Sequence, residues 1–258
     1  MAGKKKGLVV QSVKRAVQIL VAFDDQAPAM GITELAQKVG LNKSTTYGLV
    51  STLEQCGFLE QIPGSGKYRL GLKLFELGNL VMQQMELKSV AAPFLHQLAQ
   101  EVGETVHLTI RDRGETVYID KVECPHSVRL WSWVGLRKPL HSSASGKVLI
   151  SELDQETRRK LLGNTLVRRT SQTISDWEQL ERHLEQVREQ GFATDDEENE
   201  EGVRCVAAPI RNHKGVIVGA VSISGPSSRM PLDRFPDLAE QVKAAASKIS
   251  LRLGYDPG

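Results

Sequence analysis

The sequence is poor in cysteine and has no long apolar segment. Its three cysteines, Cys56, Cys124 and Cys205, lie far apart and form neither a CxxC pair nor a zinc-binding spacing. No apolar run approaches the roughly 20 residues that a membrane-spanning helix needs. The lysines near the start are followed by no sustained apolar stretch and no cleavage pattern, so we expect no signal peptide. These absences predict a cytoplasmic protein with reduced thiols and no membrane partner.

Motifs of common enzyme classes are also missing. The sequence has no GxSxG elbow, no HExxH and no phosphate-binding GxxxxGK[ST]. Cys205 as a nucleophile would need a base such as His107 or His141, and it lies in an apolar segment where thiols are usually inert. The acidic run 195–201 lacks the alternating ligands and central glycine of a calcium loop. We therefore predict no enzyme, no catalytic residue, no metal and no cofactor.

The charge is unevenly distributed along the 258 residues. Residues 1–73 contain ten Lys or Arg and five Asp or Glu, a net charge of +5, whereas the remainder carries 23 basic and 26 acidic residues, a net charge of −3. The hydrophobic fraction of 40% and charged fraction of 25% are typical of a soluble globular protein. A basic first third on a mildly acidic body favours contact of that third with a polyanion.

The first third predicts helices followed by a short hairpin. Apolar residues recur at helical spacing after Ser12, a candidate N-cap, and again after Thr33, a second candidate cap, until Gly40 ends that helix. A third helix is predicted over residues 41–57, and two short strands then flank a Pro-Gly-Ser-Gly turn. This order is the layout of a winged helix-turn-helix. A small helical subdomain without a ligand remains the alternative.

The rest of the sequence predicts a connecting helix and one α+β domain. We expect a DNA-binding domain over residues 1–71, a linker helix over 72–86 and a second domain over 87–258. In the second domain the predicted strands are 105–112, 115–122, 128–133, 203–210 and 216–224, and the predicted helices are 87–102, 144–153, 155–162, 175–190 and 234–253.

The third predicted helix has an unusual outer face. On a helical wheel its inner face holds Thr46, Leu49, Val50 and Leu53, whereas its outer face holds Ser44, Gly48, Ser51 and Gln55, flanked by Lys43, Tyr47 and Thr52. A small, hydroxyl-rich face suits the major groove, which is about 12 Å wide. Gly48 costs about 1 kcal/mol relative to alanine in a helix, and we interpret it as allowing close approach of the backbone to DNA. The alternative is that these hydroxyls merely cover the surface.

The hairpin and the N-terminal arm supply further cations. Lys67 and Arg69 alternate along one strand, which directs both to one side, where they could contact sugar-phosphate backbone. Residues 4–6 are all lysine and could contact phosphates or serve only as a solubilising tail. The predicted DNA-binding residues are Lys43, Ser44, Thr45, Tyr47, Gly48, Ser51, Lys67 and Arg69.

Two segments of the second domain suggest a ligand site. Ser222 and Ser224 share one face of a strand whose two faces both look buried, so their hydroxyls need partners, either local backbone groups or a bound polar ligand. The segment His-Ser-Ser-Ala-Ser-Gly-Lys precedes a helix, and small residues there leave backbone N–H groups accessible to an anion. A capped helix without a ligand is the equal alternative.

Together these motifs resemble the IclR-type transcriptional regulators. The resemblance rests on residues 31–78 and on the later segments "PLHSSASGKVLIS", "GFATDDEENEEGVRCVAAPI" and "GAVSISGPSSR", and it spans nearly the whole chain in order. It implies a winged helix-turn-helix, a linker helix and a GAF-like sensor domain with a mainly antiparallel sheet flanked by helices. The sugar-acid-responsive branch of the family is the most similar. Relatives usually carry Arg where this chain has Gly48, so the resemblance does not predict the operator sequence.

The resemblance also implies the partners and the site. A dimer or tetramer would bind a (pseudo)palindromic double-stranded operator, because two-fold protein symmetry matches two-fold DNA. A small organic acid would bind the sensor domain at positions matching the family's polar pocket and its apolar walls: Ala144 and Ser145 through backbone N–H, Asp195, Cys205, Ser222 and Ser224, with Leu130, Trp131 and Leu140 as walls and Trp133 as a further candidate. The competing interpretation is a small-molecule-binding enzyme or carrier with an accessory helical domain.

Overall fold

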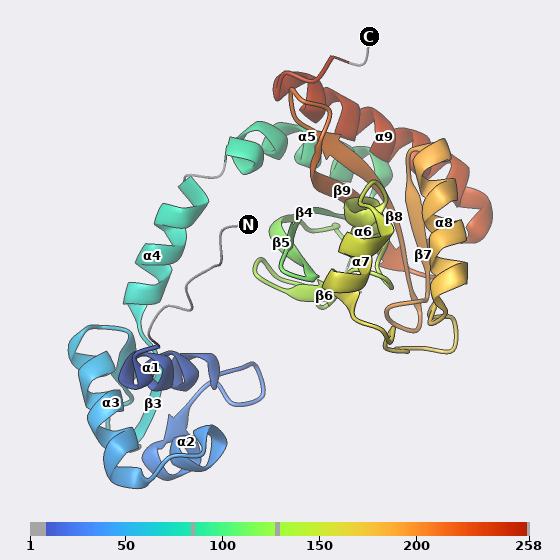
Figure 1. Cartoon of the computed structure of the whole chain (residues 1–258). Helices are drawn as coiled ribbons and strands as arrows, with labels where there is room; N and C mark the ends of the chain where they lie inside the picture. Colours follow the sequence, from blue (N-terminus) through green and yellow to red (C-terminus); the bar gives the residue numbers. More distant parts are fainter. Residues whose placement is uncertain (1–8, 84–85, 127–129, 257–258) are drawn as a thin grey trace. The chain divides into compact units, whose positions relative to one another are not determined.

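The computed structural model describes residues 9–83, 86–126 and 130–256, and it divides the chain into two compact units, residues 1–84 and 85–258 (Figure 1). The lysines at 4–6 lie outside the described residues. Over the part of the chain that is described, no helix is both long and apolar enough to span a membrane.

The N-terminal unit packs helices against a small antiparallel sheet in the order β1-β3-β2. Its elements are α1 (Gln11–Val21), β1 (Met30–Gly31), α2 (Ile32–Val39), α3 (Lys43–Gln55), β2 (Leu59–Gln61), β3 (Lys67–Leu70) and α4 (Leu72–Gln83). The helix-turn-helix and the hairpin of the wing are confirmed. The strand β1 was not predicted, because its two residues are too few to show the alternation of apolar and polar residues that marks a strand. The core holds Ile19, Leu35, Val50 and Leu59, all at most 2% exposed.

Two of the predicted helix caps are wrong. The first helix starts at Gln11, before Ser12. Its N-cap is Val10, whose side chain makes no capping hydrogen bond. The N-cap of α2 is Gly31, whose N–H donates to Glu34 Oε2 at 2.7 Å, so Thr33 lies inside the helix. Gly40 does end α2, with a φ of 68° that favours glycine. In α2 the capping hydrogen bond joins the backbone N–H of the N-cap to a carboxylate three residues later. A search for serine or threonine does not find a cap of this kind.

The C-terminal unit is built on a six-stranded antiparallel sheet in the order β6-β5-β4-β9-β8-β7. Its elements are α5 (Glu86–Val102), β4 (Thr105–Asp112), β5 (Glu115–Val122), β6 (Arg137–Pro139), α6 (Ala144–Ile150), α7 (Gln155–Leu162), α8 (Trp177–Gln190), β7 (Ala193–Asp196), β8 (Val203–Arg211), β9 (Ile217–Pro226), the short 3₁₀ helix η1 (Leu232–Arg234) and α9 (Phe235–Arg252). The α+β class and the mainly antiparallel sheet are confirmed.

The strand predicted over 128–133 is wrong where it is described. Residues 130–133 form no strand, and the N–H of Ser132 donates to the carbonyl of Leu130 instead of to a neighbouring strand. The edge strand on this side is β6, which pairs with β5. At the opposite edge, β7 overlaps the start of the acidic run 195–201, where we predicted no strand. Its carboxylates masked its alternation of buried and half-buried residues.

Strand alternation separates the two faces of the sheet. Val106, Val206 and Val221 point to the face covered by α5 and α9 and belong to the larger apolar core. The residues next to them in sequence point to the opposite face, where α6 and α8 pack (Figure 1). That second face combines an apolar core with polar side chains, and it is where the serine-bearing strand β9 meets α6.

Candidate functional site

The first turns of α3 present polar side chains to solvent. Asn42 caps the helix, since its Oδ1 accepts the N–H of Thr45 at 2.8 Å and the hydroxyl of Ser44 at 2.9 Å. Thr46 and Val50 are fully buried against the core, as the helical wheel predicts. The outer residues lie on the other side: Lys43, Ser44, Tyr47 and Gly48 are exposed, whereas Thr45 and Ser51 are half-buried.

Gly48 has no role in the packing of this unit. A Cβ atom built on it would meet no atom within 4 Å, so the fold leaves open space there. Its carbonyl accepts the hydroxyl of Thr52 at 2.9 Å. A glycine that neither packing nor a turn requires, in the middle of a helix, is consistent with close approach of another molecule at this surface.

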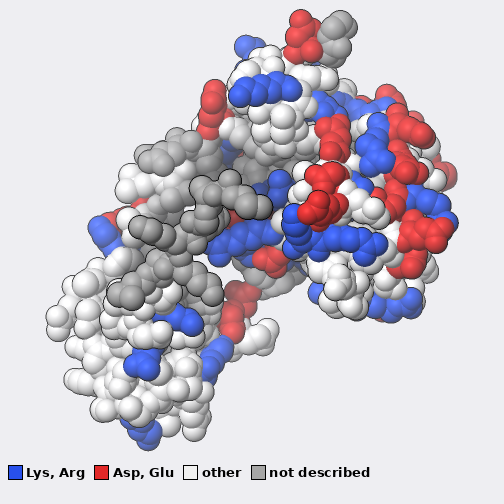
Figure 2. All heavy atoms as spheres, viewed as in Figure 1, with Lys and Arg blue, Asp and Glu red and all other residues white. Residues whose placement is uncertain are grey.

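The wing cations have acidic partners that were not predicted. Arg69 forms two hydrogen bonds to Glu60, at 3.0 and 3.2 Å, and Lys67 Nζ lies 4.0 Å from Glu34. All four side chains are about half exposed, so these pairs are weak and can exchange for phosphate. On the visible face of the N-terminal unit, Lys and Arg are scattered rather than gathered into one patch (Figure 2).

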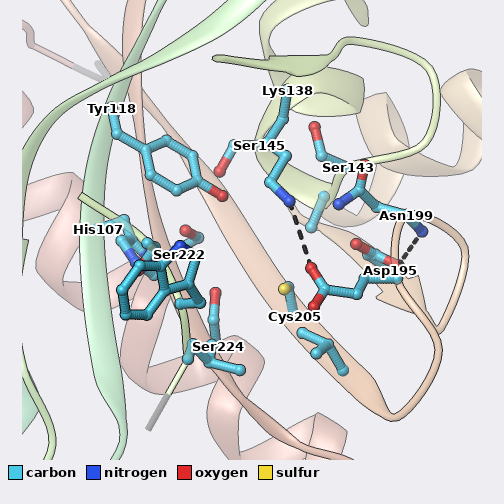
Figure 3. Close-up of a pocket in the computed structure, with 16 residues that line it drawn as sticks. His107, Tyr118, Lys138, Ser143, Ser145, Asp195, Asn199, Cys205, Ser222 and Ser224 are labelled. Carbon is cyan, nitrogen blue, oxygen red and sulfur yellow. Dashed lines mark hydrogen bonds and ion pairs between the residues drawn. The ribbon is translucent and has the colours of Figure 1, made fainter. Parts of the chain in front are cut away.

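In the C-terminal unit, polar side chains converge on a pocket between the sheet and α6 (Figure 3). The strand register explains this convergence. Asp195 of β7 pairs with Cys205 of β8, which pairs with Ser224 of β9, so these three side chains form one row across the sheet. One step along, Ser222 of β9 pairs with His107 of β4 on the same face. Adjacent strands thus supply the floor of the pocket.

Most of the predicted pocket residues lie together. The residues that line it are His107, Tyr118, Leu130, Trp131, Ser132, Lys138, Ser143, Ala144, Ser145, Asp195, Asn199, Glu200, Val203, Cys205, Ser222 and Ser224. Leu140 was predicted to line the pocket and does not. It is fully buried in the apolar core beside α6. Trp133, the further candidate, also lies outside this set.

Sequence reasoning missed one whole side of the pocket. His107 and Tyr118 come from β4 and β5, and Lys138 comes from β6. The alternation of β4 and β5 was recognised, but which face would meet α6 was not. His107 was considered as a possible base for Cys205. The strand predicted over 128–133 displaced β6, and with it Lys138, from the expected sheet.

Burial controls the charge of Asp195. This side chain is 2% exposed, and burial raises its pKa to about 7. The charge of Lys147 and two backbone N–H groups oppose this effect, those of Glu198 at 2.8 Å and Asn199 at 3.2 Å, whereas the charge of Glu198 adds to it. Burial also raises the pKa of the Cys205 thiol, which therefore stays protonated and a poor nucleophile.

His107 is neutral and partly unsatisfied. Burial, with smaller effects of the charges on Lys121 and Lys138, lowers its pKa to about 3. Its Nε2 lies 2.9 Å from Ser132 Oγ, and its ring centroid is 4.6 Å from that of Tyr118. Its buried Nδ1 has no hydrogen-bond partner among the residues that the structure describes. The hydroxyl of Tyr118 points into the pocket (Figure 3). His107 and Tyr118 therefore offer neutral groups to the pocket.

The start of α6 is held rigidly over the pocket. Ser143 Oγ accepts the N–H of Gly146 at 3.2 Å and donates to the carbonyl of Pro139 at 2.8 Å. A Cβ atom on Gly146 would lie 2.3 Å from the carbonyl oxygen of Leu140, so only glycine fits. Ala144 and Ser145, the first residues of α6, line the pocket.

The lining of the pocket supplies groups that can form hydrogen bonds and ion pairs with a small molecule. The described lining offers hydroxyl, amide, imidazole, carboxylate and amine groups, and its thiol, that of Cys205, is kept protonated by burial. Within residues 9–83, 86–126 and 130–256, no three His, Cys, Asp or Glu side chains are grouped to hold a metal ion.

Two protein-family models together match most of the chain. The model of the IclR helix-turn-helix domain matches residues 12–63, and the model of the bacterial transcriptional regulator IclR C-terminal region matches residues 79–251. The HTH-type transcriptional regulator XynR of Escherichia coli (strain K12) is 41% identical over 248 residues, covering 96% of this chain and 98% of XynR.

Solved structures show the same fold over almost the whole chain. The IclR of Thermotoga maritima is 34% identical with a TM-score of 0.78, and the match covers 95% of this chain and 99% of that one. An IclR homologue from Microbacterium hydrocarbonoxydans, complexed with 4-hydroxybenzoate, is 27% identical with a TM-score of 0.83, covering 94% and 98%. The matched proteins that carry a functional name are regulators, not enzymes. The chain therefore belongs to the IclR family of bacterial transcriptional regulators, with a helix-turn-helix DNA-binding domain followed by a C-terminal effector domain.

Proposed function

We propose that this regulator inserts α3 into the major groove of a two-fold-symmetric operator and releases it in response to a small organic acid, in the cytoplasm. The observation that carries the DNA-binding part is the exposed, small and polar start of α3, with Ser44 and Gly48 on a helix whose opposite side is buried. Such a surface lets backbone and hydroxyl groups approach base edges and phosphates. Lys43 and Tyr47 flank it, and Lys67 and Arg69 of the wing would contact the backbone.

A second copy of the chain would supply the two-fold symmetry. The helix α1 exposes Val10, Val13, Val17 and Val21, which recur at helical spacing and are 51–76% exposed. The helix α4 exposes Leu72, Phe75 and Leu80 at 54–75%. Apolar rows of this kind on a soluble regulator favour burial against a partner. A dimer places two heads on two half-sites, and a tetramer pairs two such dimers.

The effector would bind in the pocket under α6. The hydroxyls of Ser222 and Ser224, the backbone N–H groups of Ala144 and Ser145, and the side chain of Asp195 can satisfy the polar groups of a small acid, with Leu130 and Trp131 as walls. The homologue from Microbacterium hydrocarbonoxydans is complexed with 4-hydroxybenzoate, which is a small organic acid. An acid can change DNA affinity only if it binds the DNA-binding arrangement of the protein and the non-binding arrangement with different affinities. We expect a coupling free energy of about 1–3 kcal/mol between acid binding and DNA binding.

Fluorescence anisotropy on a labelled duplex from upstream of the protein's own gene tests this proposal. We expect affinity to fall steeply as salt rises, because binding neutralises several phosphates. Retention on duplex DNA that does not depend on salt would contradict it. The double variant Ser222→Ala/Ser224→Ala should lose the response to the acid while keeping operator affinity. Equal loss of both activities would show that the two serines only support the fold.

A further inference from the structure

One ion pair of the C-terminal unit spans the pocket. Lys138 belongs to β6 and Glu200 to the segment between β7 and β8, and β6 and β7 are the two opposite edges of the sheet. Lys138 Nζ lies 3.3 Å from Glu200 Oε2, and both residues line the pocket. The amine of Lys138 points into the pocket, at one end of a dashed ion pair in Figure 3. The pair therefore bridges the pocket between the two sheet edges.

Lys138 is the only Lys or Arg among the described residues that line this pocket. Its neighbour Arg137 is directed elsewhere, since its guanidinium pairs with Asp112 and Glu115. The charge of Lys138 reaches the pocket floor. It adds to the effect of burial in lowering the pKa of His107, and it opposes the effect of burial on the pKa of Cys205. Among the described lining residues, an anion in the pocket would therefore meet its cation at Lys138.

The pair of Lys138 with Glu200 differs from a second ion pair nearby. Lys147 Nζ and Glu198 Oε1 are 2.5 Å apart, and their side chains are 0% and 8% exposed. Separating buried charges is costly, so that pair is fixed. The side chains of Lys138 and Glu200 are 17% and 55% exposed at 3.3 Å. Glu200 is the exposed partner of this pair, so it can return to solvent at small cost when another anion takes its place on Lys138.

We propose that Lys138 is the counter-ion of the effector carboxylate, and that Glu200 occupies this amine until the effector displaces it. This inference rests on the proposed function of the pocket. The exchange replaces one carboxylate with another, so no unpaired charge remains in the pocket. The exchange also breaks the ion pair that joins β6 to the segment after β7, so the two sheet edges are no longer linked there when an acid is bound.

Two substitutions in the same pair separate this proposal from a structural role. Lys138→Gln removes the counter-ion, so we expect binding of the acid to weaken by about 10-fold or more. Glu200→Gln removes the competitor, so we expect binding to tighten by about two- to fivefold. Glu201→Gln is the matched control, because it makes the same charge change at the next residue, which is exposed and does not line the pocket. A pair that only supports the fold would shift affinity in the same direction in both variants.

The measurement is isothermal titration of the full chain with D-gluconate and with 4-hydroxybenzoate, each beside its neutral amide. The opposite shifts should appear with an acid and not with its amide, and Lys138→Arg should keep most of the affinity. Unchanged melting temperatures would show that the variants are folded. If an acid binds the wild type and Lys138→Gln binds it equally well, the role of Lys138 is excluded. If neither acid binds the wild type, the proposed pocket function fails, and with it this inference.

Discussion

Lys147 Nζ lies 2.5 Å from Glu198 Oε1 in the interior of the C-terminal unit, where Lys147 is fully buried. The pair joins α6 to the acidic segment after β7. Glu198 also donates its N–H to Asp195 Oδ1, so the same segment positions a carboxylate of the pocket. In the sequence, this lysine and the acidic run lie about fifty residues apart, and no local pattern links them. The structure shows that one acid of the run is the lysine's partner.

Breaking this pair from one side should strongly destabilise the C-terminal unit. Lys147→Met leaves Glu198 buried without its cation, and we expect a loss of about 3–5 kcal/mol in the free energy of unfolding. The double variant Lys147→Met/Glu198→Leu should recover most of the loss, since neither charge then remains. Urea unfolding followed by circular dichroism measures both. A single variant as stable as the wild type would show that the buried charges are hydrated.

Gly48→Ala should separate stability from DNA binding. Because a Cβ atom there meets nothing within 4 Å, alanine should stabilise the N-terminal unit by about 0.5–1 kcal/mol. If the backbone at Gly48 approaches DNA closely, the same methyl group should weaken operator binding. Thermal unfolding and anisotropy on the same protein sample give the two values. Unchanged operator affinity would contradict the interpretation of Gly48 as a contact point.

Asp195→Asn should stabilise the protein most at neutral pH and above. The pKa of Asp195 is raised from 3.8 to about 7 on folding, so the folded state binds more protons than the unfolded state between these values. Stability contributed by this group therefore falls as pH rises through that window and is constant above it. Asparagine keeps an oxygen that can accept the N–H groups of Glu198 and Asn199 but never ionises.

Urea unfolding of Asp195→Asn and wild type at about pH 5.5 and about pH 8 tests this sign. The advantage of asparagine should be larger at the higher pH. The comparison of variant with wild type removes the contribution of other groups. An advantage that shrinks with rising pH would mean that the carboxylate is stabilised, not penalised, in the folded state.

Gly146→Ala should displace the start of α6, which forms one wall of the pocket. The added methyl group would lie 2.3 Å from the carbonyl oxygen of Leu140, so α6 must move away from the segment before it. We expect a loss of about 1–3 kcal/mol in stability and a larger loss of acid binding, since Ala144 and Ser145 move with the helix. Calorimetric unfolding and titration with 4-hydroxybenzoate measure the two effects. Intact acid binding would show that the start of α6 is not part of the site.

Periodicity predicted the strands that alternate and the helices that carry apolar stripes, and it missed strands that are too short to repeat the alternation clearly. The strands β4 and β5 were predicted with the bounds that the structure has, because Val, Ile and Thr alternate over eight residues in each. By contrast β6 has three residues and β7 four, two of them aspartate. The strand β6 carries Lys138, so the error at that sheet edge became an error at the pocket, whereas Asp195 of β7 was expected there from the family resemblance.

The pocket was predicted where the motifs of the family coincide with one face of a strand. Ser222 and Ser224 were singled out because their hydroxyls lie on a buried face, and the register places both beside other pocket residues. Tyr118 and His107 carry no such local signal, since only the pairing of β4 with β9 reveals which face they share. Leu140 was predicted from its position in a motif, whereas its side chain packs under α6.

The six-stranded sheet ends on both sides in strands that resist extension. One edge reads Arg137–Lys138–Pro139, and proline has no N–H to give to a further strand. The other edge ends at Asp196, whose side chain is 44% exposed, and a second copy laid alongside would bring like charges together. Copies of this domain are thus discouraged from merging edge to edge into a continuous β-structure.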